Sequence, residues 1–256
     1  MRSAEDVVAR VAGAATGAVL AAGAALRRGK VVHPHGAVFE ARLVVPGAPA
    51  APPAAELLSR PAEHRAFVRF SRSLGVPRPL PDLLGISIRV LDAYGDGAHQ
   101  DLLAVTSADL PIVHHGFLPA RDTQQRPYTS SLPFRAGDER FILGVLPRED
   151  SPRPPGADEL ERVRNAAATG QLRFDLAVAR VMGRFMPVAE LRIGAPLPEE
   201  FDAVRFEPWK GGGGLEPIGV LNGMRRYAYP MADRAWRVTS GRAGRGTRRG
   251  RPARRR

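Results

Sequence analysis

The sequence predicts an α+β fold, with an antiparallel β-barrel as its core and helical additions near the ends of the chain. Of its 256 residues, 44% are apolar and 25% are charged, so the chain can bury a sizeable core. Strand-like segments separated by turns dominate its middle. Helical patterns are few and do not alternate with the strands, which argues against a parallel α/β fold.

Seven segments have the alternation or the β-branched composition typical of strands. Helical patterns occur in the N-terminal stretch, at 157–168 and around 225–236. The pattern alone is compatible with a barrel or a sandwich, and a family resemblance described below favours the barrel. The predicted strands are 31–45, 65–71, 85–91, 101–106, 140–146, 172–177 and 189–193.

We expect three regions: an Ala-rich N-terminal helix (1–29), one main domain (30–238) and an Arg-rich tail (239–256). The first contains an uncharged run at 11–26 that consists mainly of Ala and Gly. This run is shorter than the ~18–20 residues of a spanning helix, and Ala and Gly supply little energy of membrane transfer. The prediction is therefore a surface helix, no membrane association and a cytoplasmic protein.

Composition restricts the chemistry. The chain has no cysteine, which excludes disulfides, thiolate metal sites and a Cys nucleophile. Much of the formal net charge of +12 comes from eight arginines at 241–256, a segment without acids or a packable apolar pattern. Two interpretations stay open for this tail: weak electrostatic contact with nucleic acid, or a solvated terminus.

Segment 30–36 (KVVHPHG) places two imidazoles two residues apart. In a strand, His33 and His35 would share a face, and Pro34 would mark an edge or bulge. Such a pair suits metal binding or acid–base chemistry near neutral pH. Surface histidines beside a bend would give the same pattern.

Two more patterns carry chemistry. In one, Arg69 and Ser71 flank Phe70, so a cation and a hydroxyl would share one strand face. In the other, Arg225 precedes Tyr229 by one helical turn, from which its guanidinium would stabilise a phenolate. An exposed strand face and a buried aromatic pair with solvated arginines are the respective alternatives.

In this order, these segments resemble the haem catalase family. KVVHPHG is similar to the family's Arg-x-x-His-Ala-x-Gly, RFS at 69–71 matches its Arg-Phe-Ser, and DLLGISIR at 82–89 resembles its Asp-x-Arg-Gly-Phe-Ala-x-Lys. FEP at 206–208, GLEP at 214–217 and RRYAY at 225–229 resemble the stretch that ends in the proximal Arg-x-x-x-Tyr. The similarity spans about 30–237 and is greatest to the shorter catalase-related haem proteins.

The resemblance implies a haem cofactor and assigns residues to it. Tyr229 would be the axial ligand of the iron as a phenolate, and Arg225 would lower the pKa of its phenol. Lys30 and Arg69 would pair with the haem propionates. The family also suggests self-association.

On the opposite face of the haem, His33 would take a proton from peroxide and return it to the leaving oxygen. Ser71 would fix the tautomer of that imidazole, and Val32 would line the access channel. The family's peroxide-binding Asn is missing from 101–107, where Thr106 or Ser107 would substitute. We therefore expect a peroxidase or a weak catalase that acts on hydrogen peroxide or organic hydroperoxides, with an unidentified electron donor.

Two alternatives belong to other classes. A haem-free metal-dependent hydrolase, such as a phosphodiesterase, would combine imidazoles with acidic ligands. A non-catalytic binding module would keep the barrel without its chemistry. The residues for the hydrolase would be His33, His35, His114 and His115 with Asp101 or Asp109.

Overall fold

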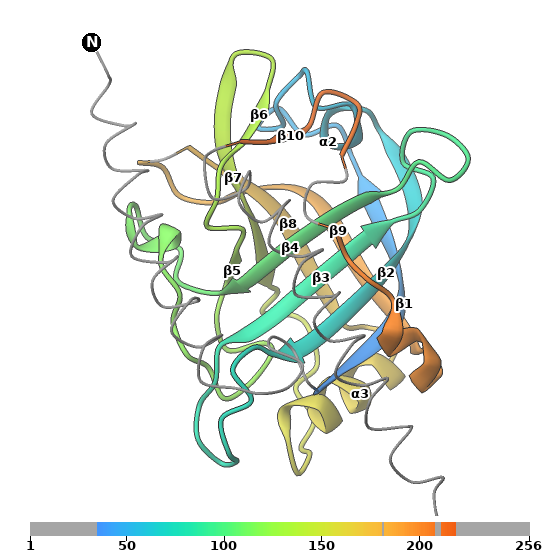
Figure 1. The fold of residues 1–256 in the computed structure, drawn as a ribbon, viewed down its shortest axis with the longest axis vertical. Helices are drawn as coiled ribbons and strands as arrows, with labels where there is room; N and C mark the ends of the chain where they lie inside the picture. Colours follow the sequence, from blue (N-terminus) through green and yellow to red (C-terminus); the bar gives the residue numbers. More distant parts are fainter. Residues whose placement is uncertain (1–34, 181, 208–210, 219–256) are drawn as a thin grey trace, which may run out of the picture.

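The computed structural model describes residues 35–180, 182–207 and 211–218. In these residues, eight antiparallel strands close into a barrel (Figure 1). Every helix in this part of the chain is too short or too polar to cross a bilayer. The barrel runs in the order β1 (His35–Val45), β2 (Ala62–Arg72), β3 (Leu84–Val90), β4 (Gln100–Thr106), β5 (Tyr128–Thr129), β7 (Glu139–Pro147), β8 (Arg173–Ala179) and β9 (Met186–Pro196), and β9 pairs with β1.

Alternation along the strands separates the inside of the barrel from its outer face. In β1, Phe39 and Leu43 are fully buried in the main core. Glu40 and Arg42, which lie between them in the sequence, are exposed. Successive side chains of a strand point to opposite faces. Every second residue of each strand therefore points into the barrel, and these side chains fill it. Aromatic rings from three strands meet inside it: Phe70 lies 5.8 Å from Phe39 and 5.5 Å from Phe174, centroid to centroid.

Short elements complete the described fold. Two of them, β6 (Phe134–Ala136) and β10 (Glu216–Pro217), extend the sheet beside β7. The helix α2 (Glu56–Ser59) follows the proline-rich loop after β1 and buries Leu57 and Leu58. The 3-10 helices are η1 (Val113–His115) and η2 (Glu199–Ala203).

The helix α3 (Glu159–Ala168) packs against β9. Asp158 caps it, since its side chain accepts hydrogen bonds from the backbone N–H groups of Leu160 and Glu161, both at 2.9 Å. Val163 and Ala166 on its inner side are fully buried. The helix therefore begins at a cap and is held by one apolar stripe.

The described residues contain all seven predicted strands, with ends that differ by a few residues, and positions 31–34 of the first lie outside the described residues. The strand expected at 65–71 starts three residues earlier, at Ala62, and the one expected at 189–193 extends over Met186–Pro196. The two-residue strand β5, together with β6 and β10, was not predicted, because so few residues show no alternation. The helix expected at 157–168 is present as α3. The other two expected helices lie outside the described residues.

Candidate functional site

Arg69 and Ser71 lie on the outer face of β2 and are nevertheless buried. Their neighbours Val68 and Phe70 belong to the barrel core, so strand alternation directs Arg69 and Ser71 outward. Only 7% of Arg69 and 2% of Ser71 is exposed. A buried cation and hydroxyl on the outside of a barrel define a candidate site on that face. The sequence had predicted that they share a face.

Arg69 is held by a partner that the sequence did not reveal. Its Nε donates to Oδ1 of Asp202 at 2.7 Å, and Asp202 belongs to η2, more than a hundred residues later. The guanidinium also lies against Gly36, where an added Cβ would stand 2.6 Å from the Arg69 guanidinium carbon. Gly36 therefore leaves space for the ion pair. The propionate contact expected of Arg69 stays a prediction, and it would share the guanidinium with Asp202.

Ser71 belongs to a row of small residues that crosses the outer face of the barrel. Each member is the direct cross-strand partner of the next, so all of them face outward at one level. Glycines, Ser, Thr, Val and Ala rise little above a sheet, and this level therefore forms a low platform. Arg69 covers it at Gly36, and Phe185 covers it at Gly144. In order from β1 to β8 the row is Gly36, Ser71, Gly85, Val105, Thr129, Gly144 and Ala177.

Thr106 does not join Ser71. It is fully buried, and its Oγ1 accepts a hydrogen bond from the backbone N–H of Leu84 at 3.1 Å. Because Thr106 follows Val105 in the strand, the two side chains point to opposite faces of the barrel wall. Val105 is thus the β4 residue that lies at the level of Ser71 on the outer face. The structure does not support the expectation that Thr106 substitutes for a peroxide-binding Asn.

Ser107 is also engaged elsewhere. It is fully buried, and its Oγ donates to the carbonyl of Gly116 at 2.7 Å. The hydroxyl therefore ties the end of β4 to the loop after η1.

His114 and His115 form a buried pair at the flank of this platform. His115 Nδ1 lies 3.2 Å from the carbonyl oxygen of Ser131, whereas its Nε2 is buried without a hydrogen-bond partner in the described part of the chain. The His114 ring packs 5.5 Å from that of Phe185, which covers Gly144 on the outer face. Such contacts orient an imidazole and leave Nε2 as the acceptor. The sequence showed the two histidines but not their burial.

The carboxylates proposed as metal ligands form hydrogen bonds with other groups of the protein. Asp101, fully buried, receives two hydrogen bonds from Arg89 at 2.7 and 2.6 Å. Asp109 Oδ1 accepts the backbone N–H of Phe185 at 2.8 Å. Across 35–180, 182–207 and 211–218, no three His, Asp or Glu side chains gather as metal ligands do. The described residues therefore give no support to the hydrolase alternative.

The chain has four tyrosines, and the two described ones are poor candidates for a phenolate ligand. Burial inside the barrel, with a smaller contribution from the charge of Asp122, raises the pKa of Tyr128 well above its usual value. Its hydroxyl donates to the carbonyl of Thr123 at 2.7 Å. Burial likewise raises the pKa of Tyr94, whose hydroxyl donates to Gln100 at 2.8 Å. Both phenols stay protonated at neutral pH.

Five predicted haem-site residues lie outside the described residues, and the structure does not test them. They are Lys30, Val32, His33, Arg225 and Tyr229.

A solved structure entitled "Structure of a bacterial catalase" superposes with a TM-score of 0.61 at 13% sequence identity. The fold is catalase-like. The match covers 84% of this chain and 59% of the bacterial catalase, so the chain spans about three fifths of that protein. No protein-family model and no curated protein sequence matches the chain. At this identity the similarity concerns the fold alone.

Proposed function

We propose that this catalase-like protein is a haem-dependent hydroperoxidase, a peroxidase or weak catalase that reduces hydrogen peroxide or organic hydroperoxides. The observation that carries the proposal is the outer face of β2, where buried Arg69 and Ser71 lie beside Gly36 and Gly85. Arg69 and Ser71 are two of the residues to which the family resemblance gives a role at the haem. A catalase-like barrel is the fold in which that motif would be expected.

The described residues fit a flat, anionic cofactor on this face. A planar macrocycle needs a surface without large side chains. Ser71 and Gly85 are adjacent members of the low platform, whereas Gly36 next to them lies against the guanidinium of Arg69. Arg69 on the same face supplies positive charge, which suits carboxylate groups. The fit is incomplete at Val105, because an apolar side chain cannot donate a hydrogen bond to peroxide.

In this proposal each of five residues of the chain has a separate role in haem binding, proton transfer or substrate access. Tyr229 holds the iron, and Arg225 lowers the pKa of its phenol so that the oxygen is deprotonated. His33 accepts the hydroperoxide proton at an imidazole nitrogen and returns it to the leaving oxygen. The Ser71 hydroxyl orients that imidazole, and Val32 limits access to small substrates. Haem, when bound, supplies a redox-active iron that accepts oxidising equivalents from peroxide.

The absorption spectrum of the full-length protein, produced with sufficient iron and haem, tests the proposal. We expect a Soret band with high-spin ferric features, and we expect Tyr229→Phe to lose these features because the ligand oxygen is removed. Tyr227→Phe, two residues away, is the matched control and should keep the wild-type spectrum. A colourless protein that does not take up haem, or equal spectra for wild type and Tyr229→Phe, would overturn the assignment.

A haem-binding module without turnover is the second candidate. Val105 favours it, since the residue at the level of Ser71 on β4 cannot hydrogen-bond peroxide. The two candidates differ in one measurement. A haem-loaded protein whose spectrum is unchanged by hydrogen peroxide and by an organic hydroperoxide is a module, whereas a spectrum that changes and then returns with a reducing donor indicates a peroxidase.

We also propose weak nucleic-acid contact through the Arg-rich tail at 239–256. Binding of the full-length and tail-deleted proteins to DNA at two salt concentrations tests it. Phosphate contacts by the tail predict weaker binding after deletion and a less steep salt dependence. Equal binding by the two proteins would contradict the proposal.

A further inference from the structure

Four arginines stand directly opposite one another on the outer face of the barrel, across β2, β1, β9 and β8. Side chains paired in this way have Cβ atoms ~5 Å apart, and like charges opposite each other destabilise a sheet. The row therefore creates positive potential on a rigid surface. In strand order its members are Arg65, Arg42, Arg192 and Arg173.

Acidic residues neutralise part of this row. Arg42 pairs with Glu63 at 2.6 Å, and Arg192 pairs with Glu190 at 2.5 Å. Each of these contacts uses one nitrogen of a guanidinium that carries five N–H donors. Arg65 forms no salt bridge within the part of the chain that the structure describes. The row therefore keeps both net charge and free donors at its β2 end.

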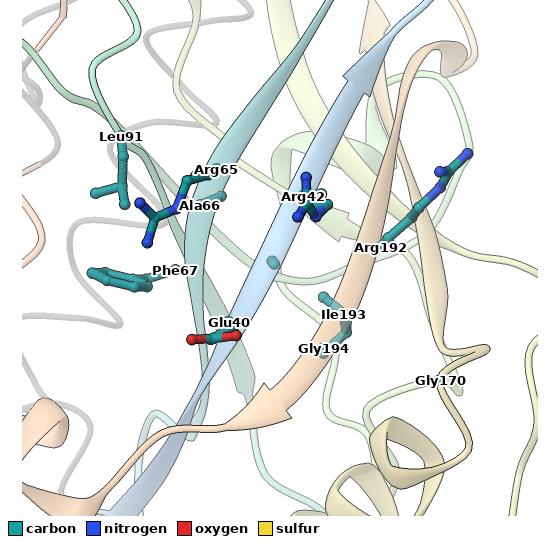
Figure 2. A pocket seen from close by; sticks show the side chains of 11 residues that line it. Glu40, Arg42, Arg65, Ala66, Phe67, Leu91, Gly170, Arg192, Ile193 and Gly194 are labelled. Carbon is teal, nitrogen blue, oxygen red and sulfur yellow. The ribbon is translucent and has the colours of Figure 1, made fainter.

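Three of these arginines line an open surface cavity of about 270 Å³, which we call the arginine pocket (Figure 2). Figure 2 shows that Arg65 and Phe67 come from β2, Glu40 and Arg42 from β1, and Arg192 from β9. This volume is slightly below the ~300–1,000 Å³ that is typical of ligand sites. The pocket suits a compact ligand.

We propose that the arginine pocket binds an oligophosphate group, that is, two or more linked phosphates. The planar guanidinium fork binds phosphate oxygens in pairs. Neighbouring strands are ~4.8 Å apart, so the row from Arg65 on β2 to Arg192 on β9 extends over ~10 Å. A single phosphate bridges only one adjacent pair of arginines, whereas a linked series reaches all three. The site is separate from the proposed haem face and does not depend on it.

Glu40 allows a second test of the proposal, in which the expected change in oligophosphate affinity is opposite to that for an arginine. Its carboxylate lines the same pocket and has no salt bridge among the described residues. Glu40 and Arg42 lie two residues apart on the outer face of β1, about 7 Å along the strand. A negative charge at this distance repels a bound phosphate. Removal of this charge should therefore strengthen oligophosphate binding, whereas removal of an arginine should weaken it.

Titration of the full-length protein with inorganic tripolyphosphate by calorimetry, beside orthophosphate at equal ionic strength, tests the proposal. We expect tripolyphosphate to bind more tightly. Arg65→Gln should weaken its binding about five- to tenfold, because a charge-assisted hydrogen bond is lost. Glu40→Gln should strengthen it. Arg153→Gln is the matched control: Arg153 is exposed, lies outside the pocket and makes no ion pair in the described residues.

The proposal fails if Arg65→Gln and Arg153→Gln weaken binding equally, since the overall charge or the Arg-rich tail would then account for it. It also fails if Glu40→Gln binds no more tightly than wild type, or if tripolyphosphate binds no better than orthophosphate. Equal melting temperatures of the variants without ligand show that they are folded. Arg65 and Glu40 are exposed, so we expect both substitutions to leave the barrel intact.

Discussion

Val105 and Thr106 are neighbours in β4, but they face opposite sides of the barrel wall. Val105 lies on the outer face at the level of Ser71. Thr106 points inward, and its hydroxyl oxygen accepts a hydrogen bond from the backbone N–H of Leu84. The side-chain period of a strand is two. A role that is assigned one position too far along the strand therefore falls on a residue of the core instead of one on the outer face. The β4 residue on the outer face at the level of Ser71 is therefore apolar.

If the outer face binds haem, Val105→Asn should increase the rate of peroxide dismutation. The new amide would supply the hydrogen bond that the family uses, and a single such donor can change a rate by about 10-fold or more. Oxygen release from hydrogen peroxide by the haem-loaded protein measures this. Thr106→Val is the control: it should give no gain and should lower the free energy of unfolding by about 1–3 kcal/mol, since Leu84 loses its buried acceptor. No gain from Val105→Asn would argue against the assigned geometry.

Single elements are joined by buried charges as well as by apolar contacts. Arg72, at the end of β2, lies 3.2 Å from a carboxylate oxygen of Asp82 and 3.1 Å from one of Glu159 in α3. Its side chain and both carboxylates are at most 5% exposed. Asp82 also accepts the backbone N–H groups of Leu74 and Val76, both at 3.0 Å. The network connects a barrel strand, a loop and the helix.

Arg72→Met should lower the free energy of unfolding by about 3–5 kcal/mol, because it leaves the buried carboxylate of Asp82 without its counter-charge and that of Glu159 with Arg78 alone. Urea denaturation followed by circular dichroism measures the loss. Arg60→Met removes an exposed arginine from an i,i+4 pair with Glu56 and should cost less than about 1 kcal/mol. Similar losses for the two variants would show that burial does not strengthen the network.

The cap of α3 predicts a pH dependence. Burial alone would raise the pKa of Asp158, but the backbone N–H of Glu161 and the charge of Arg78 outweigh it, so the pKa lies below its usual value. A group with a lowered folded pKa stabilises the protein above its ordinary pKa of 3.8 and loses this contribution as the pH falls through the folded pKa.

Asp158→Ala should therefore cost about 1 kcal/mol at neutral pH. The difference from wild type should shrink as the pH falls below the ordinary pKa of the group. Urea unfolding over this pH range is the measurement. Asp158→Asn keeps a capping oxygen without the charge and should not show the same pH dependence. A constant difference at all pH values would refute the electrostatic part of the cap.

At the scale of the whole molecule, the described strands share one interior. Phe70 packs between Phe39 and Phe174, which come from β1 and β8, and all three are fully buried. Phe70→Ala should lower the free energy of unfolding by about 3–5 kcal/mol. Phe67→Ala, on the outer face of the same strand, should cost less. Near-UV and far-UV circular dichroism should report one coincident transition, and separate transitions would mean that the barrel is not a single cooperative unit.

The long strands and α3 were predictable because each bears its own periodicity and, for α3, its own cap. The pairing of Arg69 with Asp202 was not, since the two residues are 133 positions apart and neither motif refers to the other. The two-residue strand β5 is likewise defined by its partners rather than by its sequence. Prediction from the sequence therefore succeeded for local patterns and failed for contacts between distant segments.

Local residue order by itself determined the seven long strands of this protein and the shared face of Arg69 and Ser71, and its resemblance to catalases predicted the catalase-like fold. Only the tertiary structure decided that Val105 rather than Thr106 lies on the outer face at the level of Ser71, two strands away, and that four arginines from four strands form one row. The physical reason is register. Alternation specifies the two faces of a strand, but barrel closure determines which residues of different strands stand at the same level.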